Sequence, residues 1–183
     1  MAVDEHARLL ELLRERSYER RRVTLASGRE SDFFIDCKQT ILTAEGHALT
    51  GSLLLGRLDR LGTSVGAVAG VELGGCPLAS AVSLTSFLRG RPLPALYVRK
   101  QQKDHGSRRL VEGDRALTPG LPVALLEDVI TTGGSSLAAV RSLTEAGAHV
   151  VGIVALVDRQ EGGEEAIRAA GLPLEAIFRR SDF

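Results

Sequence analysis

The sequence lacks an excess of charge of either sign. Lysine and arginine together number 23, aspartate and glutamate together also number 23, and the formal net charge is therefore zero. Proteins that bind nucleic acids generally, or that bind anionic membrane surfaces, usually carry a surplus of basic residues. We therefore expect no nucleic-acid partner and no membrane partner, although a local basic patch is compatible with this composition.

Cysteines are also scarce, since Cys37 and Cys76 are the only two, and they show neither metal-ligand spacing nor a disulfide framework. The chain has no apolar run close to the ~20 residues of a membrane-spanning helix. Its N-terminal stretch MAVDEHARLLELLRER carries acids and bases early, unlike the apolar core of a signal peptide. These absences predict a protein of a reducing compartment, and we expect it in the cytoplasm.

Internal repeats and low-complexity linkers are absent as well, and the 183 residues include 44% hydrophobic ones, enough for one sizeable core. We predict a single domain over residues 1–183. Helix patterns cover residues 3–16 and 43–61, the second with Thr43 as its N-cap, and short extended pieces cover 23–25 and 33–35 around a polar turn.

From residue 64 onward, patterns of buried strands alternate with helix patterns. The predicted strands are 64–72, 95–99, 123–129, 150–158 and 174–178, and the predicted helices are 77–88, 135–148 and 163–171. This alternation predicts an α/β fold with a parallel-sheet core and flanking helices. In such sheets, ligands bind at the carboxyl ends of the strands.

The most informative stretch is VALLEDVITTGGSS, residues 123–136. Glu127 and Asp128 follow an apolar run, so we expect them at the end of a strand, before a loop of hydroxyls and glycines that opens a helix. Backbone N–H groups, hydroxyls and a helix N-terminus suit a phosphate, and the two acids suit the hydroxyls of an attached ribose. The loop has no lysine and the chain has no G-x-G-x-x-G pattern, which disfavours a P-loop and a dinucleotide site. The alternative is an ordinary strand-to-helix loop with a Ser/Thr cap and two solvated acids.

Three further loops lie at the same predicted edge of the sheet. Residues 97–116 form a long polar loop that suits closure over a polyanion, although a solvated surface loop is the alternative. Residues 70–79 join a strand to a glycine-rich turn and to a helix with Pro77 in its first turn. In 157–163, Arg159 can hold a carboxylate in a bidentate pair, or it pairs at the surface with Asp158 or Glu161.

Together the four loops resemble the type I phosphoribosyltransferase family, and more closely its branch that acts on orotate. Residues 123–136 are similar to the family's signature for 5-phosphoribosyl 1-diphosphate. RKQQKDHG (99–106) is similar to the orotate branch's catalytic loop, SGRESDFFID (27–36) to its N-terminal substrate segment, and VDRQEGG (157–163) to the strand end that supplies an orotate-binding arginine. The resemblance covers about residues 23–163.

That resemblance implies a Rossmann-like three-layer fold in which residues 1–42 contribute a helix and a small N-terminal hood. It implies an enzyme that transfers the 5-phosphoribosyl group from 5-phosphoribosyl 1-diphosphate to orotate, giving orotidine 5′-phosphate and diphosphate in pyrimidine biosynthesis. It also implies Mg²⁺ bound with the diphosphate, no metal ligand among the protein side chains, and a homodimer whose mobile loop reaches the neighbouring site.

The resemblance further assigns roles to residues. Glu127 and Asp128 bind the ribose hydroxyls, and Thr131 to Ser135 cradle the 5-phosphate. The catalytic residues are Lys103, His105, Arg99 and Asp128. The substrate-binding residues are Phe34, Lys100, Glu127, Asp128, Val129, Ile130, Thr131, Thr132, Gly133, Gly134, Ser135 and Arg159.

The chain departs from the family pattern at two places where many members have lysine, because Ala26 precedes the SGR segment and Leu73 and Gly74 stand in the third loop. Lys38 is a candidate for the missing charge. Three other functions stay open: a phosphoribosyltransferase acting on a purine or on uracil, a non-catalytic regulator that senses phosphoribosyl diphosphate, and a structural α/β domain without a ligand.

Overall fold

The computed structural model describes residues 4–21, 23–24, 30–101 and 110–183. The main strands are β5 (Ala67–Val71), β6 (Ala95–Val98), β7 (Val111–Glu112), β8 (Pro122–Ile130), β9 (His149–Asp158) and β10 (Leu174–Arg179). They form a six-stranded sheet in the order β10-β9-β8-β5-β6-β7, in which only β6 and β7 are antiparallel neighbours. The predicted α/β class with a mostly parallel sheet is confirmed.

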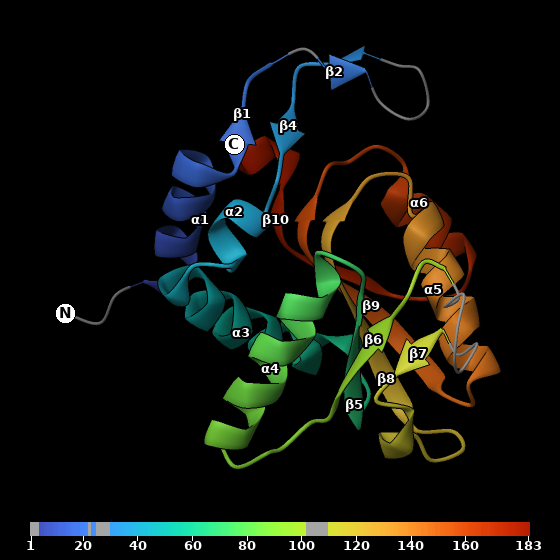
Figure 1. Cartoon of the computed structure of the whole chain (residues 1–183). Coiled ribbons are helices and arrows are strands. Elements are labelled where there is room, and N and C mark those ends of the chain that lie inside the picture. Colours follow the sequence, from blue (N-terminus) through green and yellow to red (C-terminus); the bar gives the residue numbers. More distant parts are fainter. Residues whose placement is uncertain (1–3, 22, 25–29, 102–109) are drawn as a thin grey trace.

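Helices cover both faces of this sheet, which gives three layers (Figure 1). One face is covered by α3 (Ala44–Leu58) and α4 (Gly75–Leu88), with α1 (Glu5–Arg16) beside α3, and the other by α5 (Gly134–Glu145) and α6 (Gly163–Ala169). Successive strand residues point to opposite faces. In β8, Ala124 and Leu126 join the core on the α3–α4 side, whereas Val123 and Leu125 join the core on the α5–α6 side. Burial on both faces explains why this strand is a continuous apolar run.

The crossover connections change direction between β5 and β8. The chain runs from β5 through α4 to β6 on one side, and from β8 through α5 to β9 on the other. Because α4 and α5 cover opposite faces, the sheet has a topological switch point between β5 and β8. Such switch points are where open α/β sheets bind ligands.

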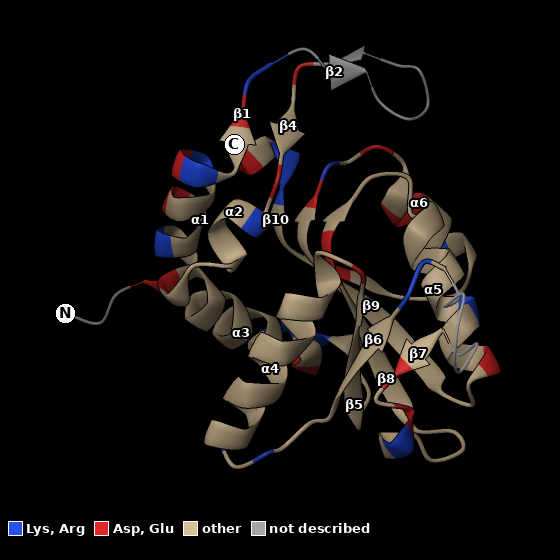
Figure 2. Ribbon diagram, viewed as in Figure 1, with Lys and Arg blue, Asp and Glu red and all other residues tan. Residues whose placement is uncertain are grey.

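The N-terminal part forms the expected hood. β1 (Tyr18–Glu19) pairs with β4 (Phe34–Ile35), and β2 (Val23–Thr24) pairs with β3 (Glu30–Ser31), both antiparallel. An aromatic cluster attaches the hood to the C-terminal residues, because the rings of Tyr18 and Phe33 each lie 5.5 Å from that of Phe183. Figure 2 shows charged residues around the hood and the sheet ends, whereas α4 carries none.

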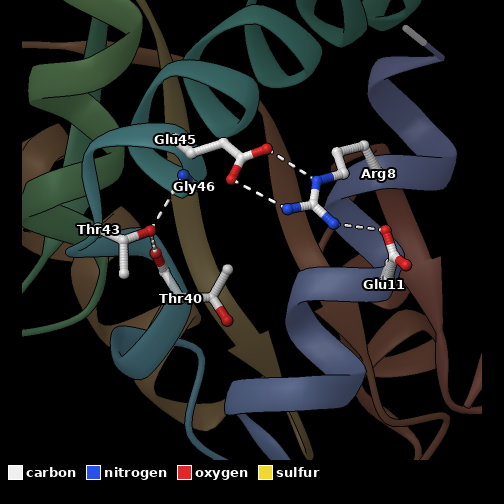
Figure 3. A network of polar contacts seen from close by, with 6 residues as sticks. All are labelled: Arg8, Glu11, Thr40, Thr43, Glu45 and Gly46. Atoms are coloured by element: carbon white, nitrogen blue, oxygen red, sulfur yellow. Dashed lines mark hydrogen bonds and ion pairs between the residues drawn. The ribbon is translucent and has the colours of Figure 1, made fainter.

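The short helix α2 (Lys38–Ile41) follows β4 and leads directly into α3. Thr43 accepts a hydrogen bond from the N–H of Gly46 at 3.1 Å and donates one to the carbonyl of Thr40 at 2.8 Å (Figure 3). The predicted N-cap at Thr43 is therefore confirmed. Gly46 is required for this turn, since a Cβ there would lie 2.2 Å from the Thr40 oxygen.

An ion pair between helices fixes the same corner. The guanidinium of Arg8 in α1 holds both carboxylate oxygens of Glu45 in α3, at 2.7 and 3.1 Å, and also contacts Glu11 (Figure 3). These groups are exposed to solvent, so the pair is weak in isolation. Its geometric effect is to set where α1 crosses the start of α3, next to α2.

The structure corrects several predicted boundaries. The strand predicted over 64–72 is shorter, so Glu72 lies in the following turn, and the strand predicted over 123–129 continues through Ile130. The helix predicted over 43–61 ends as α3 at Leu58 and continues as the 3₁₀ turn Asp59–Leu61, and the helix predicted from Pro77 begins at Gly75. Across the described part of the chain, no helix is long and apolar enough to cross a membrane.

Candidate active site

A cavity of about 290 Å³ lies at the switch point between β5 and β8. Its walls come from the end of β5 and the turn after it, from β8, and from the first residues of α2 and α5. The lining residues are Lys38, Val71, Glu72, Leu73, Gly74, Lys100, Glu127, Asp128, Val129 and Ser135. Five of the predicted substrate-binding residues therefore meet in one cavity.

The cavity forms because β8 extends further than β5. Gly70 pairs with Leu126 and β5 ends one residue later, whereas β8 stays paired with β9 until Ile130 lies opposite Asp158. The two acids therefore lie among the last four residues of β8, which agrees with the predicted strand 123–129. Their backbone is held by β9 while their other side borders the open end of β5.

Glu127 points to the α5 side of the sheet. Its Oε1 accepts a hydrogen bond from the Ser136 hydroxyl at 2.7 Å, and only 4% of the residue is exposed. Burial raises the pKa of Glu127 to about 7, although the Ser136 hydrogen bond acts in the opposite direction. Glu127 is therefore not a solvated acid, as the alternative interpretation of this stretch had it.

Asp128 points to the opposite face, against the turn that follows β5. A Cβ at Gly74 would lie 2.0 Å from Asp128 Oδ2, so the carboxylate occupies the space that a side chain at position 74 would need. Its Oδ1 accepts a hydrogen bond from the N–H of Val129 at 3.0 Å. Burial raises the pKa of Asp128, and the positive charge of Lys38 opposes that shift.

Two lysines, Lys38 and Lys100, also line this cavity. The backbone N–H of Lys100 donates to Glu72 Oε1 at 2.6 Å. A second cavity of about 280 Å³ borders the first and shares Val71, Lys100 and Ser135 with it. Arg99 lines this second cavity, with its guanidinium 3.4 Å from a carboxylate oxygen of Glu112.

Two of the predicted catalytic residues cannot be placed in this geometry. Lys103 and His105 lie outside the described residues. Their roles stay predictions.

The turn between β8 and α5 has the form expected of a phosphate cradle. Gly133 has a φ of 79°, a conformation that glycine adopts without strain, and Gly134 is the first residue of α5. The first N–H groups of an α-helix have no partner within the helix. Together with the hydroxyls of Thr131, Thr132 and Ser135, they suit an anionic oxygen. Ile130 is a core side chain, so only its backbone can face a ligand.

Arg159 and Phe34 do not line the cavities described above. Nη2 of Arg159 donates to the carbonyl of Phe33 at 3.0 Å and lies 2.8 Å from Glu161 Oε1. The alternative for Arg159 was an ion pair at the surface. The pair with Glu161 is present, but Arg159 is buried and does not lie at the surface. Phe34 is partly buried, with the guanidinium of Arg21 lying 4.0 Å from its ring centre. Both residues lie at the junction of sheet and hood.

The sequence did not reveal Glu72 and Ser136 as members of this site, and it left Lys38 open. Glu72 carried a usable signal, since it is an acid at the end of an apolar run, as Glu127 is. Ser136 stands in the first turn of a helix, from which its hydroxyl reaches the preceding strand. Lys38 does line the cavity.

Comparisons with known proteins agree with this architecture. Residues 43–169 match the family described as Phosphoribosyl transferase domain. An orotate phosphoribosyltransferase of Sorangium cellulosum is 75% identical over 179 residues, which cover 98% of this chain and 93% of that protein. A crystal structure of the Mycobacterium tuberculosis orotate phosphoribosyltransferase is 39% identical, covers 97% of this chain and 98% of its own, and has a TM-score of 0.81.

A second structure of the Mycobacterium tuberculosis enzyme, in complex with 5-phospho-α-D-ribosyl 1-diphosphate, is 36% identical, covers 97% of this chain and 98% of its own, and has a TM-score of 0.78. The chain therefore belongs to the phosphoribosyltransferase family, and within that family to its orotate phosphoribosyltransferases.

Proposed function

We propose that this protein transfers the 5-phosphoribosyl group from 5-phosphoribosyl 1-diphosphate to orotate, and so forms orotidine 5′-phosphate and diphosphate in pyrimidine biosynthesis. The observation that carries the proposal is the 75% identity to an orotate phosphoribosyltransferase over 98% of this chain. The donor complex of the Mycobacterium tuberculosis enzyme, whose fold this chain shares, supports the choice of donor.

The donor's ribose phosphate matches the β8 side of the cavity. The 5-phosphate binds at the N-terminus of α5, where Thr131 to Ser135 supply N–H and hydroxyl donors. The ribose hydroxyls donate to the carboxylates of Asp128 and Glu127, both of which border the cavity. With the sugar held at both ends, its C1 faces the open end of β5.

The reaction is a displacement at C1. The bond from C1 to the diphosphate oxygen breaks, a ring nitrogen of orotate forms the new bond, and that nitrogen loses its proton. Positive charge develops on the ribose ring, as in glycosyl transfer generally, and the Asp128 carboxylate favours it. Arg99, Lys100 and Lys103 stabilise the negative charge of the departing diphosphate, and His105 is a candidate proton carrier.

Orotate occupies the side of the site nearest the hood. The guanidinium of Arg159 binds its carboxylate, an interaction for which a planar fork is well suited. Phe34 and the residues from Val129 to Thr131 complete this part of the site. The hydrogen bond from Arg159 to the carbonyl of Phe33 supports the proposal, because it holds the guanidinium at the sheet–hood junction.

The residues at the cavity fit a magnesium ion that arrives with the diphosphate. Within the part of the chain that the structure describes, no group of three or more metal-ligating side chains could hold a metal alone. The cavity is lined by three carboxylates, Glu72, Glu127 and Asp128, and by two ammonium groups, Lys38 and Lys100. Because the lining is acidic, it favours a diphosphate whose negative charge is partly neutralised by a bound cation. Mg²⁺ suits this role, since in phosphate sites it takes many of its ligands from phosphate and water. When bound, the ion would stabilise negative charge on the leaving group.

We also propose a homodimer in which α4 supplies an apolar face. This helix has no charged residue, and Leu84, Phe87 and Leu88 are 58%, 68% and 74% exposed. Large exposed apolar side chains without charges among them are typical of interface cores. Phe87→Glu should therefore shift the molar mass in light scattering toward the 19.5 kDa of one chain. Ala169→Glu, on the exposed end of α6, is the control and should leave the mass unchanged.

The proposed sharing of the loop 99–106 between subunits is tested by mixing two variants. Lys103→Ala and Asp128→Asn should each be nearly inactive alone. A mixed dimer would carry one site with both defects and one with neither, so about half the wild-type activity per mixed dimer should return. Mixed dimers that form without recovered activity would show that the loop serves its own subunit.

Two further expectations belong to the proposal. One domain over residues 1–183, with residues 1–42 contributing to the hood and substrate segment, is supported by a core in which Leu9, Phe33 and Phe178 belong to one cluster. A cytoplasmic location stays a prediction.

The decisive experiment mixes the protein with orotate, 5-phosphoribosyl 1-diphosphate and Mg²⁺ and follows the absorbance of orotate. We expect loss of orotate with formation of orotidine 5′-phosphate and diphosphate, and no reaction without Mg²⁺. Equal or better turnover with uracil, adenine or hypoxanthine would assign the protein to another phosphoribosyltransferase activity. Donor binding without turnover of any base would favour a regulator.

A further inference from the structure

Lysine is rare in this chain. Of its 23 lysine and arginine residues, only Lys38, Lys100 and Lys103 are lysines. Lys100 and Lys103 belong to the cationic loop assigned above to the diphosphate, and Lys38 lies more than sixty positions away from them in the sequence. In the structure, Lys38 and Lys100 line the same cavity. Arginine occupies the other 20 of these positions, so two of the chain's three lysines line this one cavity.

The backbone brings Lys38 to the cavity in a defined way. Lys38 is the first residue of α2, and the preceding Cys37 is fully buried with its Sγ 3.7 Å from the carbonyl oxygen of Asp128. The junction of β4 and α2 therefore packs directly on β8 at the acid that borders the ligand cavity. The side chain of Lys38 is 37% exposed, so its ammonium remains accessible to a ligand.

Asp36 pairs with the ammonium of Lys38 in the structure. The distance from Lys38 Nζ to Asp36 Oδ1 is 2.5 Å. Asp36 also accepts hydrogen bonds from the backbone N–H of Lys38 at 3.2 Å and from the side chain of Gln39 at 3.1 Å. These backbone and side-chain bonds lower the pKa of Asp36 although its burial acts to raise it.

Position 74, in the turn after β5, has no room for a cationic side chain beside Asp128. Asp128 Oδ2 would be 2.0 Å from a Cβ at Gly74, so a longer side chain at position 74 would displace the carboxylate. Lys38 approaches the same cavity from the other chain segment and leaves Asp128 in place. The side of the cavity beside Asp128 therefore obtains its cation from α2.

We propose that Lys38 binds the diphosphate of the phosphoribosyl donor, opposite Lys100. This assignment rests on the proposed function, which it deepens. On donor binding, the Lys38 ammonium exchanges its contact with Asp36 for the diphosphate oxygens. Lys38 and the loop cations then hold the leaving group from two sides.

The competing explanation is that Lys38 and Asp36 form a purely structural ion pair. The two explanations predict opposite effects for two matched variants. Lys38→Met removes the ammonium and keeps the length of the side chain. Asp36→Asn keeps an oxygen for the Lys38 N–H and removes the charge that competes for the ammonium.

The experiment is titration calorimetry of the full chain with inorganic diphosphate in the presence of Mg²⁺. Lys38→Met should weaken binding about tenfold or more, as expected for a lost charge-assisted hydrogen bond. Lys38→Arg should recover part of the affinity, and Asp36→Asn should bind as tightly as the wild type or more tightly. Unchanged affinity in Lys38→Met, or equal weakening in Asp36→Asn and Lys38→Met, would overturn the assignment.

A second measurement needs no substitution. Wild-type protein is treated with an amine-acetylating reagent, and modification of each lysine is followed by mass spectrometry with and without magnesium diphosphate. Lys38 should be modified several-fold more slowly in the presence of the ligand, while the N-terminal amine serves as the internal reference. Unchanged modification of Lys38 under saturating diphosphate would contradict the proposal.

These measurements are separable from the test of the reaction itself. A protein that binds diphosphate through Lys38 and does not consume orotate would contradict the proposed function and support the role of Lys38. If the wild-type protein consumes orotate and the Lys38→Met variant binds diphosphate as tightly as the wild type, the proposed function would be supported and the role of Lys38 contradicted.

Discussion

Replacing Glu127 with glutamine should reduce the protein's loss of stability between pH 5 and pH 8. Glu127 is buried beside Asp128 and accepts a hydrogen bond from Ser136. The glutamine oxygen can accept the same bond, and the variant has no carboxyl proton to lose. The substitution therefore isolates the free energy of ionising one buried group.

The magnitude follows from the pKa. Burial raises the pKa of Glu127 from an ordinary 4.5 to about 7, so the folded state binds this proton more tightly than the unfolded state does. The associated stabilisation is fully present below pH 4.5 and is lost as the pH rises through about 7. At ~1.4 kcal/mol for each tenfold difference in proton affinity, the group makes the free energy of unfolding fall by about 2 to 3 kcal/mol between pH 5 and pH 8. Asp128, whose pKa is also raised, adds to the effect in the same direction.

The assay is urea denaturation of the ligand-free protein at pH 5 and pH 8. The difference between the two pH values should be smaller by about 2 to 3 kcal/mol in Glu127→Gln than in the wild type. Costs of the substitution that do not depend on pH cancel in this comparison. Glu145→Gln makes the same chemical change at an exposed position of α5 and should leave the pH dependence unaltered.

The same variant should bind the phosphoribosyl donor more weakly, because an amide is a poorer acceptor for ribose hydroxyls than a carboxylate. A protein that is more stable at pH 8 and less active would be the expected trade between stability and function. An unchanged pH dependence of unfolding in Glu127→Gln would refute the reasoning, since the carboxyl would then titrate alike in the folded and unfolded chains.

Three other substitutions test the remaining parts of the site. Ser136→Ala removes the hydrogen bond that lowers the pKa of Glu127, so this pKa should rise further. The acidic limb of a plot of donor Kd against pH should then move to higher pH. An unmoved limb would show that Ser136 is a packing residue only. Gly74→Ala places a methyl group where the Asp128 carboxylate lies. It should raise the KM for the donor about tenfold, the effect expected for one lost charged hydrogen bond, while the thermal midpoint changes little. An unchanged KM would show that the carboxylate can bind the donor from another position. Arg159→Lys loses the planar fork and should raise the KM for orotate far more than that for the donor, whereas equal effects on both would contradict a contact with orotate.

The sequence predicted the elements whose residues repeat a clear pattern. β5, β8 and β9 are long apolar runs, and α3 has both an apolar stripe and a Thr43 cap. The pieces that the sequence did not predict, β1, β3, β7 and α2, have two to four residues each. Segments this short have no period of their own, and they form because a partner strand or a packed helix fixes them. The predicted strand 123–129 ended one residue too early for a related reason, because pairing with β9 continues to Ile130.

The site was predictable where chemistry interrupts a pattern. Two acids inside an apolar run are costly to bury without a purpose, and this indicated Glu127 and Asp128. The hydrogen bond from Ser136 and the closeness of Asp128 to Gly74 depend on distances between elements, which no local pattern contains. Lys38 was identifiable as a charge but not as a neighbour of β8, since the packing of Cys37 on Asp128 joins segments about ninety residues apart.

Because neighbouring residues of β8 face opposite sides of the sheet, the order of the two acids in the chain has its own meaning. The longer side chain, Glu127, must span the distance to Ser136 on α5. The shorter one, Asp128, fills a small space that is bounded by the backbone at Gly74. Exchanging them would preserve charge, composition and total length, yet would leave one acid short of its partner and push the other against the turn. A protein with Asp at 127 and Glu at 128 should therefore resemble a double loss of function, although every conventional measure of similarity would rate it as nearly unchanged.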